Sequence, residues 1–414
     1  MNFTLRCHLC QTLFPATALW VCDKCLGPLE VSYDYGAIAP LLSRETIERR
    51  PKNLWRYREL LPIEGHPRTG LHSGFTPLVR ADRLAKRLGV RELYIKDDSV
   101  NHPTCSYKDR VVSVAATRAV ELGFTVFACA STGNLANSVS AHAARLGLVC
   151  SVFIPDDLEP GKVTGAGVHG PRIIAVRGNY DDVNRLCTQV ADKYKWGFAN
   201  INLRAYYAEG AKTYGFEIAE QLGWRFPRHV VSPVAGGTLL PRILKGFNEL
   251  REVGLVEGEL PAIHAAQAAG CAPVVRALQA GDEYPDPVKP KTIAKSIAIG
   301  NPADGFQVLR AVRSTGGDGA MVTDDEVIDG IRLLAETEGI FTEPAGGVTV
   351  SATRQLIERG VLGLDESIVI CITGNGYKTA EVLNGRVPQP VHIGRSLAEF
   401  DASEAAPAAV GSVE

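Results

Sequence analysis

Short apolar, β-branched runs alternate with amphipathic helical patterns along most of this 414-residue chain, and this alternation limits the possible folds most strongly. Six runs from residue 76 onward predict buried strands: ELYIKDD, TVFACAST, VCSVFIP, RIIAVRG, HVVSPVAGG and SIVICITGNG. Segments between them, such as KDRVVSVAATRAVELG, AEGAKTYGFEIAEQLG and TDDEVIDGIRLLAETEG, predict helices that end at or near glycine. The order predicts an α/β fold whose sheets are mainly parallel and covered by helices on both faces.

The bulk composition is that of an ordinary globular protein. Hydrophobic residues make up 45% and charged residues 22% of the chain, and the formal net charge is −2. A chain this close to neutral gives no electrostatic basis for binding nucleic acid or an acidic membrane. The sequence lacks both the apolar stretch of about 18 residues that a membrane span needs and an apolar secretory leader. Its ten cysteines are clustered near the start or scattered through apolar segments, which favours a cytoplasmic location.

Composition divides the chain into four parts. Residues 1–35 are rich in cysteine and too few to bury an apolar core of their own. Residues 36–75 mix proline, arginine and glycine and are expected to form a connecting arm, and residues 76–385 carry the alternating α/β pattern. The alanine- and glutamate-rich end of the chain predicts a disordered tail over residues 386–414.

Two CxxC pairs, CHLC and CDKC, lie near the N-terminus with an 11-residue spacer between them. Such pairs can place four thiolates tetrahedrally around zinc, and a segment this short needs such a link to fold. We therefore predict a structural zinc ribbon, with iron as the competing metal and four free thiols as the alternative without metal. The predicted ligands are Cys7, Cys10, Cys22 and Cys25.

Lys108, in the stretch NHPTCSYKDR, opens a helical pattern. A lysine at a helix N-terminus is electrostatically unfavourable as a plain cation. The same field would lower its pKa and favour a nucleophilic amine or an imine. The alternative is an exposed lysine whose charge Asp109 balances, and spacing alone does not choose between the two.

Three strand-to-helix loops carry small, hydroxyl or amide residues, which suit the binding of anionic groups. The loop SPVAGGTLL has the shape of a phosphate cradle, although it is neither a Walker loop nor GxGxxG. The loop ASTGNLANS could bind a carboxylate and a ring oxygen or could be a plain capped turn, and CITGNGYKT follows an apolar strand with a Gly-rich turn. The candidate residues are Ser131, Thr132, Gly133, Asn134, Ala235, Gly236, Gly237, Thr238 and Thr373.

Together these segments resemble the pyridoxal-phosphate enzymes of the tryptophan-synthase-β type (fold type II), and among them the threonine synthases. The resemblance covers about residues 70 to 385 and follows the family's order. Its other stretches are NLRAYYAEGAKTYGFEIAEQLG, AAQAAGCAPVVRAL, AIGNPADG and EGIFTEPAGGVTVSA. An N-terminal zinc ribbon is similar to that of some threonine-synthase-like proteins. The resemblance implies two doubly wound α/β domains with the cofactor between them, the smaller over roughly residues 110–210, and a homodimer.

The resemblance also implies residue roles. Lys108 would form the imine with the cofactor, Asn134 would bind its phenolic oxygen, and Thr373 would face its pyridine nitrogen. A hydroxyl at that nitrogen leaves it largely neutral, which favours elimination and replacement over transamination. The cofactor phosphate would be held by Ala235, Gly236, Gly237 and Thr238, and the substrate carboxylate by Ser131, Thr132 and Gly133.

The implied reaction is that of a lyase in threonine biosynthesis, which converts O-phospho-L-homoserine and water into L-threonine and phosphate. Lys108 would then move protons at Cα and Cβ as acid and base. Such a substrate needs a second anion site, for which Arg110 and Lys212 are the candidates by position. Each could instead be a structural ion-pair partner.

Two departures leave the substrate open. Many relatives read TGSFKDR where this chain has TCSYKDR, so Cys105 stands in place of a glycine and Tyr107 in place of a phenylalanine. The phosphate loop VAGGTLL is also closer to the cysteine-synthase or dehydratase version. The alternatives are β-replacement of O-phosphoserine, dehydration of threonine or serine, and an inactive cofactor-binding regulator.

Overall fold

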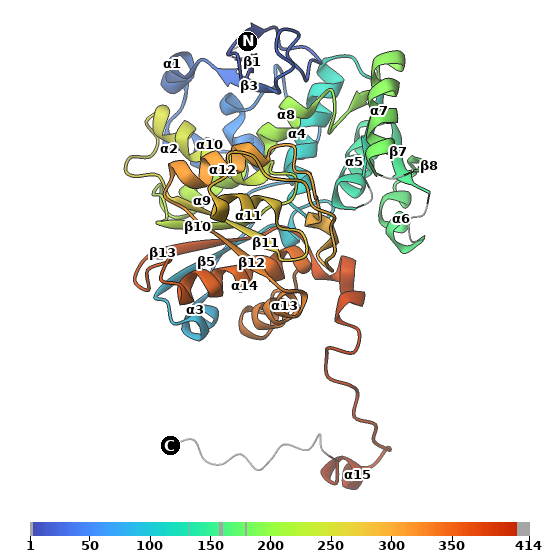
Figure 1. Ribbon diagram of the computed structural model, residues 1–414, viewed down its shortest axis with the longest axis vertical. Helices are drawn as coiled ribbons and strands as arrows, with labels where there is room; N and C mark the ends of the chain where they lie inside the picture. Colours follow the sequence, from blue (N-terminus) through green and yellow to red (C-terminus); the bar gives the residue numbers. More distant parts are fainter. Residues whose placement is uncertain (1–2, 132, 157–159, 179, 404–414) are drawn as a thin grey trace.

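The computed structural model describes residues 3–131, 133–156, 160–178 and 180–403. Its architecture consists of two largely parallel sheets, each packed with helices, and a small antiparallel sheet at the N-terminus (Figure 1). This arrangement confirms the predicted α/β class. In the described part of the chain, no helix is both long enough and apolar enough to span a membrane.

The larger sheet has six strands in the order β12-β11-β10-β13-β5-β4. All neighbours pair in parallel except β4 and β5, which are antiparallel. The carboxyl ends of its central strands therefore lie at one edge, where open α/β sheets bind ligands. The strands are β4 (Leu78–Arg80), β5 (Glu92–Asp97), β10 (His229–Pro233), β11 (Ala262–Ala268), β12 (Gly319–Val322) and β13 (Ser367–Ile372).

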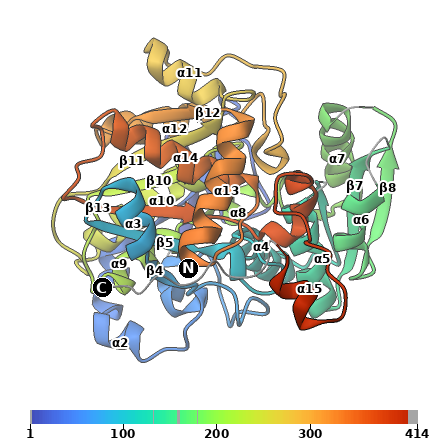
Figure 2. The ribbon, with the colours of Figure 1, turned by 90° about the horizontal axis from the view of Figure 1, so that it is seen from below.

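The smaller sheet has four parallel strands in the order β8-β7-β6-β9. All four strands lie inside the range 110–210, and Figure 2 shows this unit beside the larger one with α5, α6 and α7 around it. The strands are β6 (Val126–Ala130), β7 (Val149–Pro155), β8 (Arg172–Val176) and β9 (Gly197–Phe198), and the helices named are α5 (Asn134–Leu146), α6 (Pro160–Gly167) and α7 (Tyr180–Tyr194).

The other helices of the two units follow the predicted alternation with one exception. The single helix expected from AEGAKTYGFEIAEQLG is divided into α8 and α9, which meet at Lys212. The remaining helices are α3 (Asp82–Leu88), α4 (Lys108–Glu121), α8 (Arg204–Ala211), α9 (Thr213–Gln221), α10 (Leu239–Glu252), α11 (Pro273–Ala280), α12 (Gly305–Ser314), α13 (Asp324–Glu338) and α14 (Pro344–Glu358).

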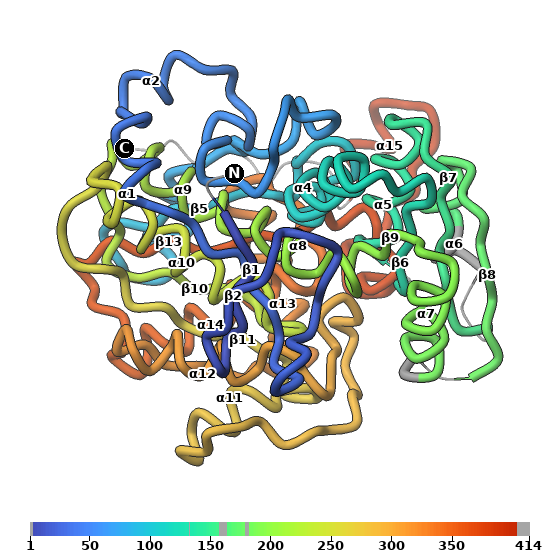
Figure 3. Tube along the Cα trace, turned by 90° about the horizontal axis from the view of Figure 1, so that it is seen from above, coloured from blue at the N-terminus to red at the C-terminus, as the bar shows by residue number. Residues whose placement is uncertain are grey.

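The N-terminal sheet pairs β1 (Phe3–Cys7) with β2 (Leu13–Phe14) and with β3 (Leu29–Tyr33). It packs on α8, and Figure 3 shows it crossing above that helix. The Tyr33 hydroxyl donates to Glu209 of α8 at 2.9 Å, and Lys245 of α10 donates to the Val31 carbonyl at 2.7 Å. The ribbon is thus bonded to the helices beneath it.

The arm and the tail carry more structure than their sequences predict. The arm forms α1 (Tyr35–Ile38), α2 (Arg44–Glu48) and the 3-10 turn η2 (Leu54–Leu60), and it buries Trp55 and Tyr57. After η5 (Gly376–Leu383) the chain leaves the body, as Figure 1 shows. Within the predicted disordered tail it forms the short helix α15 (Leu397–Asp401), whose N-terminus is capped by Ser396.

Candidate active site

The loop that carries Lys108 is bonded to the end of β13. The Tyr107 backbone N–H donates to the Thr373 carbonyl at 3.0 Å, and Asn375 N–H donates to the Cys105 carbonyl at 3.2 Å. Ser106 forms an isolated antiparallel bridge with Gly374. These contacts hold Lys108, the first residue of α4, beside Thr373 at the carboxyl edge of the larger sheet. Two segments distant in sequence thus meet where the sequence predicts a common site.

Lys108 lies between two tyrosine hydroxyls. Its Nζ donates to Tyr107 at 2.7 Å and to Tyr207 of α8 at 3.0 Å. Burial disfavours the ammonium form, but the two hydroxyls outweigh it and hold the pKa of Lys108 above its ordinary value. The lowered pKa expected from the helix N-terminus is therefore wrong for the free amine, because these phenol oxygens stabilise the charged form.

Asn134 connects the smaller unit to two residues that the sequence did not single out. Its side-chain nitrogen donates to both carboxylate oxygens of Glu343, at 3.2 and 3.0 Å. Its side-chain oxygen accepts from Lys378 Nζ at 2.8 Å. Burial raises the pKa of the Glu343 carboxyl and lowers the pKa of Lys378. The Glu343 N–H in turn donates to the Gly374 carbonyl at 3.1 Å, so the same edge of β13 organises this group.

The predicted carboxylate loop lies between β6 and α5. Ser131 N–H donates to the Phe153 carbonyl at 3.2 Å, and its hydroxyl accepts from Gly133 N–H at 3.5 Å. Gly133 is the N-cap residue of α5, so the positive end of the helix dipole points toward this loop. Thr132 lies outside the described residues.

The predicted phosphate loop, which begins at Ala235, is fixed by Asp304. Asp304 N–H donates to the Gly236 carbonyl at 2.9 Å, and its carboxylate accepts from the Thr238 hydroxyl at 3.2 Å. Gly237 has φ +93°, and a side chain there would meet the Asp304 backbone at 2.9 Å, so only glycine fits. At Gly236, by contrast, the space that a Cβ would take is open. Arg204 pairs with Asp304 at 2.8 Å and offsets its charge beside the loop.

Arg110 does not bind substrate. It is fully buried, and its guanidinium pairs with Asp98 at 2.6 Å and with Glu217 at 2.5 Å. Lys96 pairs with the same Glu217 at 2.7 Å, which completes a group of two acids and two bases. A guanidinium with all its partners in the protein interior has no donor to offer a phosphate. The structural interpretation of this residue is therefore the correct one.

Lys212 is equally unavailable. It is fully buried at the junction of α8 and α9, and it pairs with Glu209 at 2.6 Å and Glu249 at 2.8 Å. The same Glu209 accepts from Lys245, which also donates to the ribbon. The expected role of Lys212 in substrate binding gives way to a role in joining α8 to α10 beneath the ribbon.

Cys105 has φ +55°, in the left-handed region where a side chain is strained. Its N–H donates to the Asn101 carbonyl at 2.7 Å, and its carbonyl accepts from Asn375, so the strained conformation is held from both sides. The glycine of the resembling sequences would adopt this backbone freely. The loop that carries Lys108 thus has a thiol side chain at position 105 in spite of a backbone that favours glycine.

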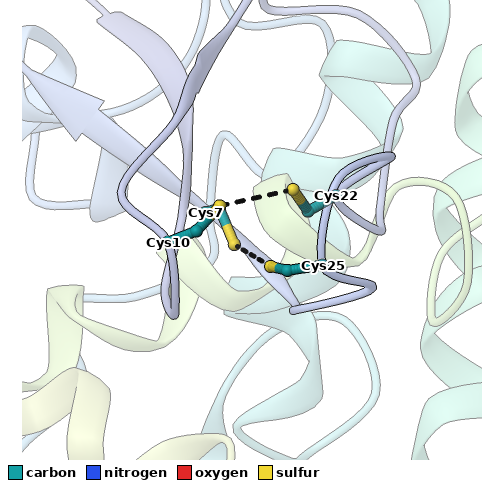
Figure 4. A group of neighbouring side chains, drawn as sticks. All are labelled: Cys7, Cys10, Cys22 and Cys25. Atoms are coloured by element: carbon teal, nitrogen blue, oxygen red, sulfur yellow. Dashed lines mark hydrogen bonds between the residues drawn. The ribbon is translucent and has the colours of Figure 1, made fainter.

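The four N-terminal cysteines point toward one another (Figure 4). Their sulfur atoms all lie within 4.8 Å of one another, with Cys7 and Cys25 at 3.4 Å and Cys10 and Cys22 at 3.6 Å. Sulfurs of a tetrahedral zinc site lie about 3.8 Å apart, given Zn–S bonds of about 2.3 Å. The donor set and its spacing fit a structural metal ion.

The site also fits the predicted cofactor. It holds a lysine amine, a glycine loop with open space at Gly236 and the buried Thr373 hydroxyl at the end of β13. The fully buried Ser106 hydroxyl beside Lys108 has no partner among the described protein atoms. Pyridoxal phosphate has an aldehyde that can form an imine with the lysine amine, a phosphate that the glycine loop can bind, and a ring nitrogen that the hydroxyl can face.

Comparison with known proteins agrees with this geometry. Residues 70–374 match the model of the family "Pyridoxal-phosphate dependent enzyme". The threonine synthase of Methanocaldococcus jannaschii is 38% identical over 94% of this chain and 96% of its own length. That of Methanosarcina acetivorans is 36% identical over 95% and 97%. The chain therefore belongs to the pyridoxal-phosphate-dependent enzymes, and within them to the threonine synthase family.

Solved structures share the fold at lower identity. Maize serine racemase has a TM-score of 0.63 and 19% identity over 75% of this chain and 91% of its own. Diaminopropionate ammonia lyase from Escherichia coli has a TM-score of 0.64 and 19% identity over 83% and 92%. These likenesses confirm the tryptophan-synthase-β-like architecture.

Four residues of the site escaped sequence reasoning: Tyr207, Asp304, Glu343 and Lys378. Each lies inside a stretch that carried the resemblance, so the stretches were the available signal. Their roles depend on partners far along the chain, such as Tyr207 with Lys108 and Asp304 with Thr238. The local spacing of residues in the sequence does not indicate such pairs.

Proposed function

We propose that this chain is a threonine synthase that converts O-phospho-L-homoserine and water into L-threonine and phosphate. The observation that carries the proposal is the convergence of Lys108, Thr373, Asn134 and Glu343 at one edge of the larger sheet. The identity of 38% with the Methanocaldococcus jannaschii enzyme over 94% of the chain supports the substrate. The bound cofactor would supply the electron sink for carbanions at the substrate's carbons.

Proton movement in this proposal falls to Lys108. As a neutral amine, Lys108 would first remove a proton from one substrate carbon and so become an ammonium. The hydroxyls of Tyr107 and Tyr207 stabilise this ammonium, because they raise its pKa, until it delivers the proton to another substrate carbon. Burial raises the pKa of Tyr207 to about 12, so this hydroxyl stays protonated while Lys108 changes state.

The remaining residues bind and orient the cofactor and the substrate in this proposal. Lys108, Asn134, Thr373 and the loop Ala235, Gly236, Gly237 and Thr238 would bind the cofactor. Ser131, Thr132 and Gly133 would bind the substrate carboxylate at the N-terminus of α5, where the helix dipole favours an anion. Thr373 can offer only a hydroxyl to the ring nitrogen, which supports elimination chemistry over transamination.

The direct test is phosphate release. The purified chain is loaded with pyridoxal phosphate, and its visible absorbance is recorded before and after borohydride to establish the bond to Lys108. Phosphate and threonine are then measured with O-phosphohomoserine. Equal amounts of both products are expected, whereas a loaded enzyme that releases neither contradicts the proposal.

A second candidate is β-replacement of O-phosphoserine. Cys105 favours it, because this strained residue adds a thiol side chain to the loop that carries Lys108, where many resembling sequences have glycine. A narrower site suits the shorter substrate. Phosphate release from O-phosphoserine with a sulfur nucleophile, and none from O-phosphohomoserine, would select this activity.

We further propose that Cys7, Cys10, Cys22 and Cys25 bind a structural zinc ion, which is supported by sulfur atoms within 4.8 Å of one another. Elemental analysis should give about one zinc per chain, and a Cys10→Ser, Cys25→Ser variant should lose it. Iron in its place, or no metal in freshly purified protein, would contradict this assignment.

The enzyme is also proposed to act as a cytoplasmic homodimer. None of the ten cysteines forms a disulfide in the structure, which suits a reducing compartment. Sedimentation of the loaded enzyme tests the dimer, and a monomer mass would contradict it.

A further inference from the structure

The side-chain amide of Asn134 lies between a lysine and a carboxylate. Lys378 Nζ reaches its oxygen at 2.8 Å, and its nitrogen reaches Glu343 at 3.0 and 3.2 Å. The three residues come from η5, α5 and the N-terminus of α14, three separate parts of the chain. A surface amide would sample both orientations, but this one has a partner on each side.

The chemistry of the two partners fixes the orientation of the amide. A lysine side chain can donate hydrogen bonds but cannot accept one, so only the amide oxygen can face Lys378. The amide nitrogen must then face the opposite side, where the Glu343 carboxylate accepts from it. An amide nitrogen has two hydrogens, and one of them can be shared between the two Glu343 oxygens, which leaves the other for a second acceptor.

Lys378 is surrounded by groups that interact with its charge. The charged and titratable groups that act on it are Glu343, Asp109 of α4 and the Cys105 thiol. Asp109 is fully buried and already accepts from Thr104 and from Ser138. Lys378 Nζ donates its hydrogen bond to the Asn134 side-chain oxygen.

We propose that Lys378 is a positioning residue that acts through Asn134, holding the amide so that its nitrogen faces the phenolic oxygen of the cofactor. This inference rests on the proposed function, in which Asn134 binds that oxygen. Lys378 itself then need not touch the substrate or cofactor. The donated hydrogen bond stabilises the phenolate form of the oxygen. It therefore lowers the pKa that is observed when the cofactor's visible absorbance is titrated.

The test is a double-mutant cycle read from the cofactor's absorbance between pH 6 and pH 10. Asn134→Ala removes the donor and should raise the titration midpoint by about one pH unit. Lys378→Met should also raise the midpoint, since the amide then keeps only its bond to Glu343 and its nitrogen is held less firmly toward the cofactor. The double variant should match Asn134→Ala alone, because Lys378 acts through that residue.

Lys378→Arg, which keeps the donor, should remain near the wild-type midpoint. Glu358→Gln, at the exposed far end of α14, is the matched control and should leave the midpoint unchanged. If Lys378→Met fails to load the cofactor, Lys378→Gln provides the same comparison with a weaker donor and should give a smaller shift.

Two results would overturn the inference: an unchanged midpoint in Lys378→Met, or shifts that add fully in the double variant. Full additivity would mean that Lys378 acts by its own charge. These outcomes are separate from failure of the proposed function, because the titration requires only a loaded cofactor. Absence of phosphate release by the loaded wild-type enzyme would instead refute the substrate and leave the cycle interpretable.

Discussion

Lys108 and Arg110 stand two residues apart at the start of α4, yet their surroundings differ completely. Lys108 lies between two neutral hydroxyls, whereas Arg110 is enclosed by two carboxylates, Asp98 and Glu217. The hydroxyls stabilise the ammonium form of Lys108 but form no ion pair with it, so the side chain can still give up and regain a proton. Carboxylates confine the guanidinium to a structural role. The partner, more than the cation or its position in a motif, decides between chemistry and structure.

Replacement of Lys108 should give the largest effect on activity. Lys108→Ala removes both the covalent attachment and the proton carrier, so kcat should fall by about 10³-fold or more. The chain should still fold, because no carboxylate loses its partner. Steady-state kinetics and circular dichroism measure the two halves of this prediction. Wild-type turnover in the variant would remove Lys108 from the chemistry.

Replacement of Arg110 should mainly lower the stability of the fold, whereas replacement of Lys108 mainly lowers activity. Arg110→Met leaves two buried carboxylates with Lys96 as their remaining cation, which should cost about 3–5 kcal/mol of unfolding free energy. Urea denaturation of the metal-loaded protein measures this loss of unfolding free energy. The exposed pair Arg49–Glu45 offers a control, since Arg49→Met should change stability by less than about 1 kcal/mol. Equal effects in both variants would contradict the comparison.

The same network predicts a loss of stability in acid. Burial alone would raise the pKa of Glu217, but Arg110 and Lys96 outweigh it and lower the pKa to about 2, from 4.5 in the unfolded chain. A depressed carboxyl pKa contributes stability above pH 4.5 and loses it as the pH falls toward 2. Denaturant midpoints measured across this window should decline, and Glu217→Gln should flatten the decline. An unaltered slope in that variant would assign the acid loss to other groups.

A smaller effect is expected from Tyr207→Phe. Without this hydroxyl the Lys108 ammonium has one partner fewer, so its pKa falls and the corresponding limb of the kcat–pH profile should move to lower pH by about half a unit. Tyr206→Phe is the control on the same helix, because the Tyr206 hydroxyl donates to the Thr17 carbonyl of the ribbon. That variant should keep the wild-type profile. A shift of equal size in both would indicate a general disturbance of α8.

The smallest change is expected from Cys105→Gly. Relief of the left-handed strain, about 1–2 kcal/mol, is partly offset by the greater freedom of glycine in the unfolded chain, about 0.5–1 kcal/mol. The variant should therefore be more stable by about 0.5–1 kcal/mol in denaturant titrations. Its kcat/KM ratio for O-phosphohomoserine over O-phosphoserine should rise if the thiol narrows the site. An unchanged ratio would show that Cys105 does not select the substrate.

Sequence reasoning succeeded where the signal is local. The strands β6, β10 and β13 are dense in β-branched or apolar residues, and the two CxxC pairs are close neighbours in the chain. It missed β11, whose sequence AIHAAQA is rich in alanine and has little strand preference of its own. That strand forms because β10 and β12 pair with it on either side.

The misassigned cations show the limit of local patterns. Arg110 and Lys212 lie in motifs beside the expected site, and a sequence does not reveal which acids meet them in the fold. Glu217 reaches Arg110 from α9, and Glu249 reaches Lys212 from α10. Only the packing of those helices shows that both charges are already balanced.

Helix α8 has further consequences for how the molecule melts. Tyr206 and Glu209 bind the ribbon on one side of this helix, while Tyr207 reaches Lys108 on the other. Opening the ribbon would therefore leave the buried Glu209 without its bond from Tyr33 and loosen the helix that supports the reactive amine. Ribbon and catalytic unit should behave as one cooperative block, with a single calorimetric transition that moves to lower temperature when the four thiolates lose their metal.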